Sequence, residues 1–449
     1  MTMGRRKDKQ PELFIASTNL PTSPGHVFYD KLNALLAAAG FDSFVEELSR
    51  PYYHQDVGRP SLPPGIYFRM LFVGYFEGID SQRGIAWRCS DSRSLQTFLG
   101  FLPTEATPDH SSLTHIGQRL PQLVHDQVFA FVLGLAEQNG LTIGARVGVD
   151  ATTLEANAAM KTLQRRDSGA DYQTYTRQLA EEAGLEKPSA AEVRRFDRQR
   201  PHKKMSNADW VSPSDPDSEI AKMKDGTTHL AYKAEHVVDL DTELVLAAAI
   251  LPASTGDAAS LAASMMSAEI NLVRTESAAE IQEIATDKGY HKLETLEEMA
   301  AQGYRTYIPE PEQAHEHDWR DKPAERERAY RNNRRRTKGD YGRRLQRLRS
   351  ERVERSFAHV CETGGARRSH LRGRDKVAKR YLMTVAAHNL SIVMRKLYGK
   401  GKPRTLQGSR AGLATVFRSL LWFCAIRSRA LVFSRRIQRR WLPTLKWHS

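Results

Sequence analysis

The sequence predicts a mixed α/β protein in which an all-α region precedes a domain that contains a sheet. Apolar residues recur at helical spacing through residues 26–143. From residue 144 onward, strand-like and helical segments follow one another in the order β-β-β-α-β-α-β-α. Carboxylates occur on the first strand, at the end of the fourth strand and on the last helix of this series. We therefore expect the candidate catalytic residues in the sheet domain.

A chain of 449 residues exceeds one ordinary hydrophobic core, so we expect more than one domain. We assign an extended arm to residues 1–25, an all-α region to 26–143 and the α/β domain to 144–398. Within the α/β domain, residues 160–210 form a charged insertion, whose mixed charges are typical of solvated helices with surface salt bridges. A basic extension occupies residues 399–449.

The charge of the chain favours an anionic polymer as its partner. The formal net charge is +14, and neutralising each phosphate of a nucleic acid releases a condensed counterion. Lys and Arg are dense in residues 331–355 and again in 367–380, and no Asp or Glu follows Gly399. Nucleic acid is therefore the expected partner class. The basic extension also contains three tryptophans. The sequence is therefore compatible both with a poorly ordered basic tail and with an amphipathic helix that binds a partner.

Cysteine spacing and hydropathy exclude several classes of protein. The three cysteines are far apart and lack CxxC spacing, so neither a zinc site nor a disulfide framework is expected. The basic N-terminus is not followed by the apolar segment of a secretory signal. The longest apolar stretch, residues 411–426, contains Arg418 and is shorter than the roughly 20 residues that span a bilayer. We expect a cytoplasmic protein without a membrane partner.

Helix signals divide residues 26–143 into several short helices. Gly40 separates the first two, and Pro63 and Pro64 introduce a strongly apolar helix that ends at Gly78. Further helices begin after Asp91-Ser92 and Asp109-His110-Ser111-Ser112, and a longer one covers residues 123–140. Such a region serves either as a scaffold for dimerisation or as a DNA-binding module, and the sequence leaves both open.

Two strand-like segments end in an aspartate. The apolar run Val147-Gly148-Val149 reads as a buried strand that delivers Asp150 at its exit. Residues 281–286 form a similar run that leads into Asp287 and a glycine turn. A lone aspartate in such a place is more often a turn residue or a helix cap, but two of them in one sheet domain indicate paired ligands or catalytic groups.

The remaining elements complete the alternation. Residues 229–238 and 244–251 form two strands of a meander, and a helix begins at Asp257. A helix over residues 293–301 and a strand over residues 304–308 come after the Asp287 strand. The final helix is expected to begin near Glu325 and to carry Glu354.

Glu354 is the third candidate carboxylate. A lone glutamate in an Arg-rich helix is usually a salt-bridge partner, and Glu351 and Glu362 are neighbours that compete for the same role. Because Val353 and Phe357 form an apolar i, i+4 pair and Glu354 is expected to share a face with Phe357, the helix phase predicts that Glu354 points toward the core.

Taken together, these segments resemble bacterial insertion-sequence transposases of the DDE type, whose catalytic domain is ribonuclease-H-like. The resemblance covers residues 10–400, and no single motif within it would be specific alone. The motifs are Val149-Asp150-Ala151-Thr152, Ser212-Pro213-Ser214-Asp215-Pro216-Asp217, Gly226-Thr227-Thr228-His229-Leu230-Ala231-Tyr232-Lys233, Thr286-Asp287-Lys288-Gly289-Tyr290 and Val353-Glu354-Arg355-Ser356-Phe357.

The resemblance implies that Asp150, Asp287 and Glu354 are the catalytic triad and hold two Mg²⁺ ions, with Mn²⁺ as a substitute. Hard divalent cations take carboxylate ligands, and two such ions activate an attacking water or 3′-hydroxyl and stabilise the leaving oxygen. The implied activity is cleavage at the ends of an insertion sequence and joining to target DNA. The implied partners are double-stranded DNA, as terminal inverted repeats and target, and a second copy of the chain, in the bacterial cytoplasm at the nucleoid.

One motif of the family is missing. Related transposases often carry a Tyr-two-Arg-three-Glu-six-Lys signature, and counting from Glu354 finds Arg347, Ser350 and Cys361 at its other positions. We expect Arg352, Arg355, Arg367 or Arg368 to substitute for it in contacting the DNA end. Lys288, directly after Asp287, is also expected to contact DNA, and a structural role in the turn stays open for it. Two alternatives stay open, a metal-dependent nuclease that cuts without joining and a DNA-binding protein that has lost catalysis. The presence of all three carboxylates favours catalysis.

Overall fold

The computed structural model describes residues 25–54, 58, 61–142, 144–201, 205–223, 226–312 and 318–403. Nearly all of the expected N-terminal arm lies outside these residues. So does most of the basic C-terminal extension, including its tryptophans.

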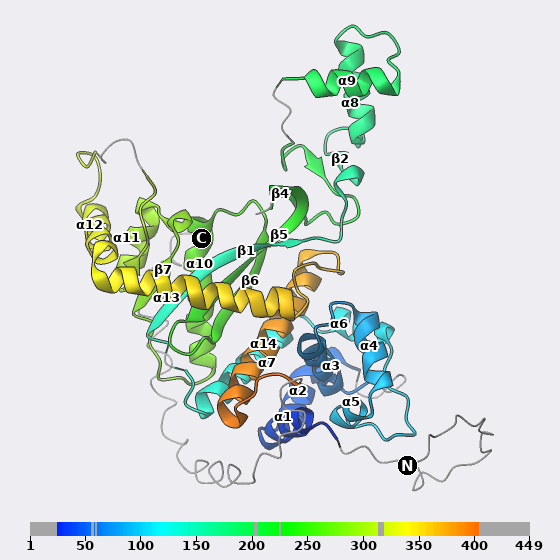
Figure 1. Cartoon of the computed structure of the whole chain (residues 1–449), viewed down its shortest axis with the longest axis vertical. Coiled ribbons are helices and arrows are strands. Elements are labelled where there is room, and N and C mark those ends of the chain that lie inside the picture. Colours follow the sequence, from blue (N-terminus) through cyan, green and yellow to red (C-terminus); the bar gives the residue numbers. More distant parts are fainter. Residues whose placement is uncertain are drawn as a thin grey trace, which may run out of the picture.

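The N-terminal part is helical, as predicted. Helix α3 (Pro64–Glu77) begins at Pro64 and ends at Gly78, whose φ of 71° is a left-handed conformation that glycine adopts without strain. Nearly every residue of α3 is buried, so it forms the centre of this part. The helices around it are α1 (Val27–Ala38), α2 (Phe41–Ser49), α4 (Gln82–Asp91), α5 (Arg93–Phe98), α6 (His110–Arg119) and α7 (Gln122–Gln138), and Figure 1 shows them as one bundle below the sheet.

The sheet contains the five strands predicted from the sequence. They are β1 (Arg146–Glu155), β5 (Thr228–Asp239), β6 (Val245–Pro252), β7 (Glu283–Thr286) and β8 (Arg305–Tyr307). β5 pairs antiparallel with β1 and β6, while β1 pairs parallel with β7, and β7 parallel with β8. A short strand that we did not predict, β4 (Glu219–Lys222), extends the sheet beside the first residues of β5.

Helices cover the two faces of this sheet. Helix α13 (Asp340–Phe357) crosses one face, and α10 (Asp257–Arg274) packs on the other (Figure 1). Side chains alternate between the faces along a strand. Gly148 of β1 therefore meets Val353 of α13, whereas Glu235 of β5 bonds Ser260 of α10. Helix α11 (Leu293–Ala301) packs beside β8, next to α12 (Ala324–Lys338).

The helix that carries Glu354 is shorter than predicted. The sequence suggested one helix from about Glu325, but the chain bends at Gly339 and separates α12 from α13. A Cβ on Gly342 would lie within 2.2 Å of the Arg336 carbonyl oxygen, so the glycines at this bend allow the two helices to meet closely. A π-helical turn (Ala358–Thr363) then ends α13.

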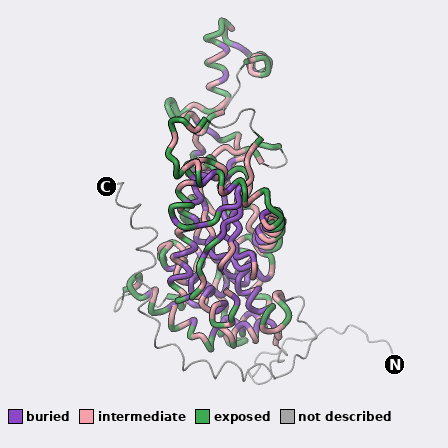
Figure 2. The backbone as a smooth tube through the Cα atoms, turned by 90° about the vertical axis from the view of Figure 1, so that its left-hand side faces the viewer, coloured by how far each residue is buried: buried purple, intermediate pink, exposed green. Residues whose placement is uncertain are grey.

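Helix α14 (Arg374–Tyr398) joins the helical part to the sheet. It packs against α3 and α7 on one side and against β6 on the other. The Asn389 side chain donates to the Val245 carbonyl oxygen at 2.8 Å and accepts from the Val245 amide at 3.0 Å. Figure 2 shows the buried residues as one continuous column through both parts, so they share a core.

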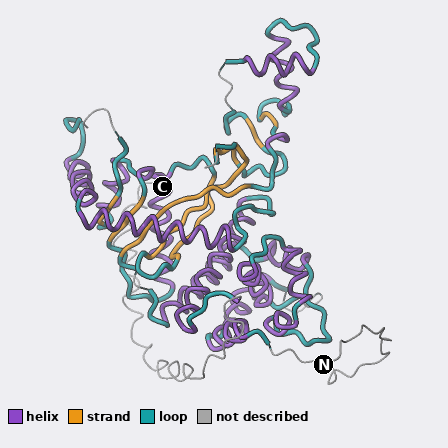
Figure 3. The backbone as a smooth tube through the Cα atoms, in the orientation of Figure 1, coloured by secondary structure: helices purple, strands orange, loops and turns teal. Residues whose placement is uncertain are grey.

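The charged insertion projects from the sheet (Figure 3). It contains β2 (Gln164–Arg165), β3 (Trp210–Val211), α8 (Tyr172–Glu182) and α9 (Ala190–Gln199). Trp210 contacts the rings of Tyr172 and Tyr175, and the Arg165 guanidinium lies over the Trp210 ring, which gives the projection a small core of its own. In the described part of the chain, no helix has the length and apolar character needed to cross a membrane.

Candidate active site

The sheet brings Asp150 and Asp287 side by side. Val149 of β1 pairs in parallel register with Thr286 of β7, and each is followed by an aspartate. Asp287 lies just beyond β7 but keeps an extended backbone, so the alternation continues and the two aspartates lie on the same face. Asp287 follows the last residue of β7, and its Oδ1 accepts from the Gly289 amide at 2.9 Å. Asp150 was predicted at the exit of its strand, but β1 continues to Glu155. The aspartate therefore lies where β1 outruns its shorter neighbour β7.

Helix α13 closes over these aspartates because position 148 has no side chain. A Cβ on Gly148 would lie 2.8 Å from Cγ2 of Val353 and 3.0 Å from Cγ of Arg349. Arg349 reaches past Gly148, and its Nη1 donates to Oδ2 of Asp150 at 2.8 Å. Sequence reasoning missed Arg349, although its position one turn before the buried Val353 gave a signal.

Glu354 is not where the helix phase predicted it. Its side chain is exposed and accepts a hydrogen bond from Ser350 Oγ at 2.8 Å. The buried face of the helix is taken by Val353, Ser356 and Phe357. Successive residues of a helix are rotated by about 100° around its axis, so a residue three positions from a buried one can still face solvent. The prediction that Glu354 points toward the core, which used Phe357 as its reference, was therefore wrong.

The three predicted carboxylates therefore do not converge as they stand. Asp150 and Asp287 share one sheet face, while the Glu354 carboxylate is turned to Ser350 on the helix above that face. Among the residues that the structure describes, no group of three or more His, Cys, Asp or Glu side chains is arranged to hold a metal ion. The two aspartates nevertheless have the oxygen donors that hard divalent cations prefer, and Asp150 already accommodates the cationic group of Arg349.

A buried histidine stands next to Asp150 on the neighbouring strand. His236 pairs with Asp150 across β1 and β5, and its imidazole bonds Ser356 Oγ at 2.9 Å and Tyr381 Oη at 2.8 Å. Because Ser356 donates to the Val353 carbonyl, it accepts from Nδ1 of His236, and Tyr381 donates to Nε2. Burial lowers the pKa of His236 to about 3, so it stays neutral and ties α13 and α14 to the sheet.

The opposite face of the same strands holds a buried ionic network. The Glu235 carboxylate accepts from Ser260, Ser264 and Tyr290, and Lys233 lies 2.7 Å from an Asp257 oxygen and 3.4 Å from a Glu235 oxygen. Burial, reinforced by the adjacent Glu235 carboxylate, raises the pKa of Tyr290, which keeps its hydroxyl as a donor. Tyr290 belongs to the turn after Asp287, so this network fixes that turn from below.

The motif at Ser212–Asp217 has a structural place. Asp215 is fully buried, and Tyr232 donates to its two carboxylate oxygens at 2.7 and 2.8 Å. The Gly373 amide, just before α14, donates to the same carboxylate at 2.9 Å. Asp215 therefore links the base of the insertion to β5 and to α14.

The basic residues that we expected to contact DNA fall into two groups. Lys288 is exposed, Arg367 donates to Thr152 Oγ1 at 3.1 Å, and Arg368 lies 3.7 Å from Glu155, so these three border the strand of Asp150 or the turn after Asp287. Arg352 and Arg355 instead pair with Glu243 in the turn between β5 and β6.

Two family models match the chain. A transposase domain (DUF772) matches residues 19–119, and a transposase DDE domain matches residues 195–390. The second match contains Asp287 and Glu354 but begins after Asp150. No curated protein and no solved structure matches the chain.

These matches agree with the architecture. The first covers most of the helical N-terminal part, and the second covers most of the sheet, the helices on its two faces and α14. Both families are transposases, which act on DNA and, in the DDE group, generally use divalent metal ions. The chain belongs to the DDE transposases of insertion sequences.

Proposed function

We propose that this transposase cuts the ends of its insertion sequence and joins them to target DNA by two-metal-ion phosphoryl transfer. The observation that carries the proposal is the register of β1 and β7, which sets Asp150 beside Asp287 on the face under α13. The family match over Asp287 and Glu354 supports the same assignment. Glu354 is the third member of the proposed triad.

The strand order supports a ribonuclease-H-like fold for the catalytic domain. Three antiparallel strands, β1, β5 and β6, are followed by the parallel strands β7 and β8, with β1 in the middle of the sheet. In this proposal residues 26–143 form the DNA-binding or dimerisation region, residues 144–398 the catalytic domain with its insertion at 160–210, and 399–449 a basic extension.

Asp150, Asp287 and Glu354 would hold the metal ions, which we propose are Mg²⁺ or Mn²⁺. When bound, the ions would activate the attacking water or 3′-hydroxyl and stabilise the leaving oxygen. To bind them, Glu354 has to turn from Ser350, and Asp150 has to exchange the Arg349 guanidinium for a metal. Arg349 is then free to contact the DNA phosphate, because a guanidinium pairs with phosphate as well as with carboxylate.

The basic residues along the same face would hold the DNA. Lys288, Arg367 and Arg368 are the stronger candidates, because they border the strand of Asp150 or the turn after Asp287, whereas Arg352 and Arg355 pair with Glu243. Arg367 also pairs with Glu362 at 2.6 Å, so it would have to exchange this carboxylate for a phosphate. Such contacts give affinity and position rather than sequence readout. Cutting two ends of one element calls for two active sites, so we propose a homodimer.

The test is cleavage of a labelled duplex that carries the element's own end, in Mg²⁺. We expect wild type to cut and Asp150→Asn, Asp287→Asn and Glu354→Gln to bind the duplex without cutting. Because the metals supply several kcal/mol of transition-state stabilisation, each variant should lose about a thousandfold or more in rate. Glu351→Gln, one turn away on the same exposed surface, is the matched control and should cut normally.

Other outcomes would overturn parts of the proposal. If Glu354→Gln cuts and Glu351→Gln does not, the third carboxylate is Glu351. If wild type binds the duplex without cutting it, the chain is a DNA-binding protein without catalysis. A pre-cut end offered with target DNA separates a transposase, which joins the two, from a nuclease, which does not.

A further inference from the structure

A cavity of about 310 Å³ lies between the helical part and the start of α14. Its walls come from α3, α4 and α6 on one side and from the segment around residue 371 and α14 on the other. None of its lining residues is acidic, and four carry a basic side chain of lysine or arginine, namely Arg372, Lys376, Lys379 and Arg380. This is a concave site with a concentration of positive charge.

Arg380 extends from α14 toward the helical part. Its guanidinium crosses to α3, where Nη1 donates to the Leu71 carbonyl at 3.4 Å and Nη2 to the Ile79 carbonyl at 3.2 Å. A Cβ on Gly74 would lie 2.6 Å from Nη2, so the glycine makes room for it. Burial lowers the pKa of Arg380 to about 10, and it forms no ion pair with a carboxylate among the described residues.

The other three cations are only partly neutralised. Lys379 pairs with Asp375 at 2.8 Å. Arg372 donates to the carbonyl oxygen of Asn157 at 3.3 Å and forms no ion pair with a carboxylate of the described residues. Lys376 is exposed at the rim. The other polar side chains of the wall include the neutral Gln82 and Thr114, which bond to each other, and His370, whose Nε2 lies 3.0 Å from Asp80 Oδ2. An excess of positive charge with neutral polar groups around it is the composition of an anion site.

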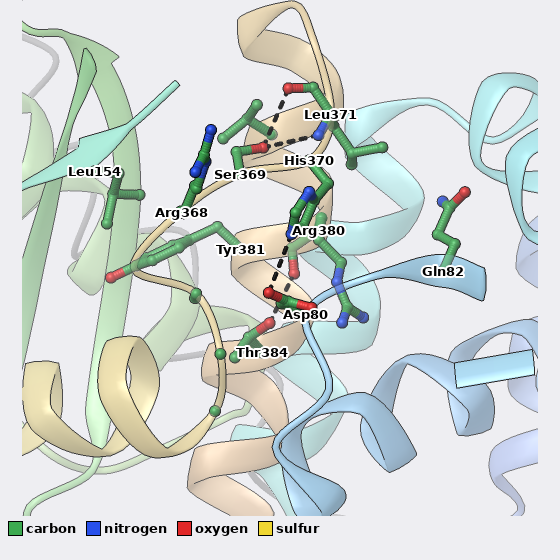
Figure 4. Close-up of a pocket in the computed structure, with 14 residues that line it drawn as sticks. Asp80, Gln82, Leu154, Arg368, Ser369, His370, Leu371, Arg380, Tyr381 and Thr384 are labelled. Carbon is green, nitrogen blue, oxygen red and sulfur yellow. Dashed lines mark hydrogen bonds and ion pairs between the residues drawn. The ribbon is translucent and has the colours of Figure 1, made fainter. Parts of the chain in front are cut away.

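The cavity is connected to the strand of Asp150. Asn157 follows the end of β1, and its Nδ2 donates to the His370 carbonyl at 2.9 Å. His370 and Leu371 line the cavity, and only Ser369 separates them from Arg367 and Arg368, which border the same strand. Figure 4 shows this segment beside a smaller hollow that shares Arg380, with His370 bonded to Asp80 at 3.0 Å.

We propose that this cavity binds a backbone phosphate of the DNA strand that runs from the Asp150 face of the sheet toward the N-terminal helices. The proposal rests on the proposed function for the presence of DNA at that face. A phosphodiester is favoured over a free anion because the cationic side chains continue from Arg367 and Arg368 to Arg372 and Lys376, as a path along a strand requires. The volume is at the lower end of ligand pockets and fits one phosphate with its sugar.

The test uses the full chain with Arg372→Gln and Lys376→Gln combined, and the labelled duplex of the element's end. Both residues are exposed, so the fold should persist, and a melting curve checks this. The control is Lys396→Gln, an exposed lysine near the other end of α14 that does not line the cavity. Arg380 stays unchanged because its bonds to α3 also hold the fold.

Two readouts locate the phosphate. Ethylation of individual DNA phosphates should block binding by wild type and by Lys396→Gln at a set of positions, and the double variant should lose one or two of these. The slope of log affinity against log salt should fall by about 1 for each phosphate lost. An ethylation pattern and a slope equal to those of Lys396→Gln would overturn the proposal.

Two further experiments complete the test. One distinguishes a DNA phosphate from a free nucleotide, and the other distinguishes failure of this proposal from failure of the proposed function. If a deoxynucleoside monophosphate binds wild type but not the double variant, while the DNA pattern is unchanged, the site holds a free nucleotide and the proposal fails. Asp150→Asn should lose cleavage and keep the full ethylation pattern. If wild type never cuts but the double variant still loses a phosphate contact, the cavity stands and the proposed catalysis falls.

Discussion

The two faces of the central sheet carry charged groups in opposite ways. On the face under α10, Lys233 and Glu235 are buried and bonded to one another and to Asp257, Ser260 and Tyr290. On the face under α13, Asp150 and Asp287 are partly exposed. Neighbouring strands of one sheet supply the two sets, since Lys233 and Glu235 belong to β5, Asp150 belongs to β1 and Asp287 follows β7. Both faces can carry charge because consecutive side chains alternate between them.

This difference separates charge that holds the fold from the charge that we propose is functional. A buried charge is tolerated when its partners are fixed around it, and the α10 face meets this condition. A metal ligand must stay accessible and must be able to change partners, and the α13 face meets that one. Sequence motifs contain both kinds, since Lys233 and Asp287 each fall in a motif that resembles those of the family.

The largest expected effect is on the buried face. Lys233→Met keeps most of the side-chain volume but leaves the Glu235 carboxylate without its cation. We expect the free energy of unfolding to fall by about 3 to 5 kcal/mol, measured by urea denaturation. Lys288→Met, at an exposed lysine, is the control and should change stability by less than about 0.5 kcal/mol. Equal stability of the two variants would show that the α10 network is not structural.

The next effect is on pH dependence beneath α13. His236 has a folded pKa of about 3, below the 6.5 of an unfolded histidine, so the unfolded chain binds its proton first as the pH falls. The contribution of a neutral His236 is therefore complete above pH 6.5 and is lost toward pH 3, by up to about 1.4 kcal/mol per pH unit.

Urea denaturation between pH 7 and pH 4 measures this slope. His236→Gln should be less stable at pH 7, because it alters the bonds to Ser356 and Tyr381, but its stability should fall less steeply with acid. A slope identical to that of wild type would contradict the assignment of the loss to His236.

The smallest effect sharpens the role of Arg349. Its ion pair with Asp150 is partly exposed, with 21% of the Asp150 side chain accessible, so it is worth about 1 kcal/mol. Because the guanidinium competes with metal for the carboxylate, Arg349→Gln should bind Mn²⁺ about fivefold more tightly in the absence of DNA, measured by calorimetry. Arg347→Gln, an exposed neighbour, should leave the affinity unchanged. Weaker metal binding by Arg349→Gln would mean that Arg349 positions Asp150 instead.

Much of the chain was predictable from local signals. Pro64 and Gly78 bound a helix because proline starts helices readily and glycine adopts the left-handed conformation at their ends. Val149 and Thr286, each followed by an aspartate, predicted two strands with carboxylates at matching positions. The parallel pairing of β1 with β7 in the structure then sets those aspartates side by side.

Other features required the tertiary structure. The phase of α13 against the sheet is decided by how Val353 and Ser356 fit against Gly148 and His236, and no helical periodicity in an Arg-rich segment specifies it. Whether an arginine faces solvent or an acid depends on a turn more than a hundred residues away, as Arg352 and Glu243 demonstrate. The network around Glu235 and the cavity beside Arg380 likewise join segments that are distant in the chain.

The sequence by itself determined the order of the elements, the two aspartates and the basic character that suits DNA, because periodicity, turn chemistry and charge are local properties. The tertiary structure alone decided which charges are neutralised and which remain available. Pairing depends on the positions of side chains from several elements, and folding fixes those positions only when the helices dock on the sheet.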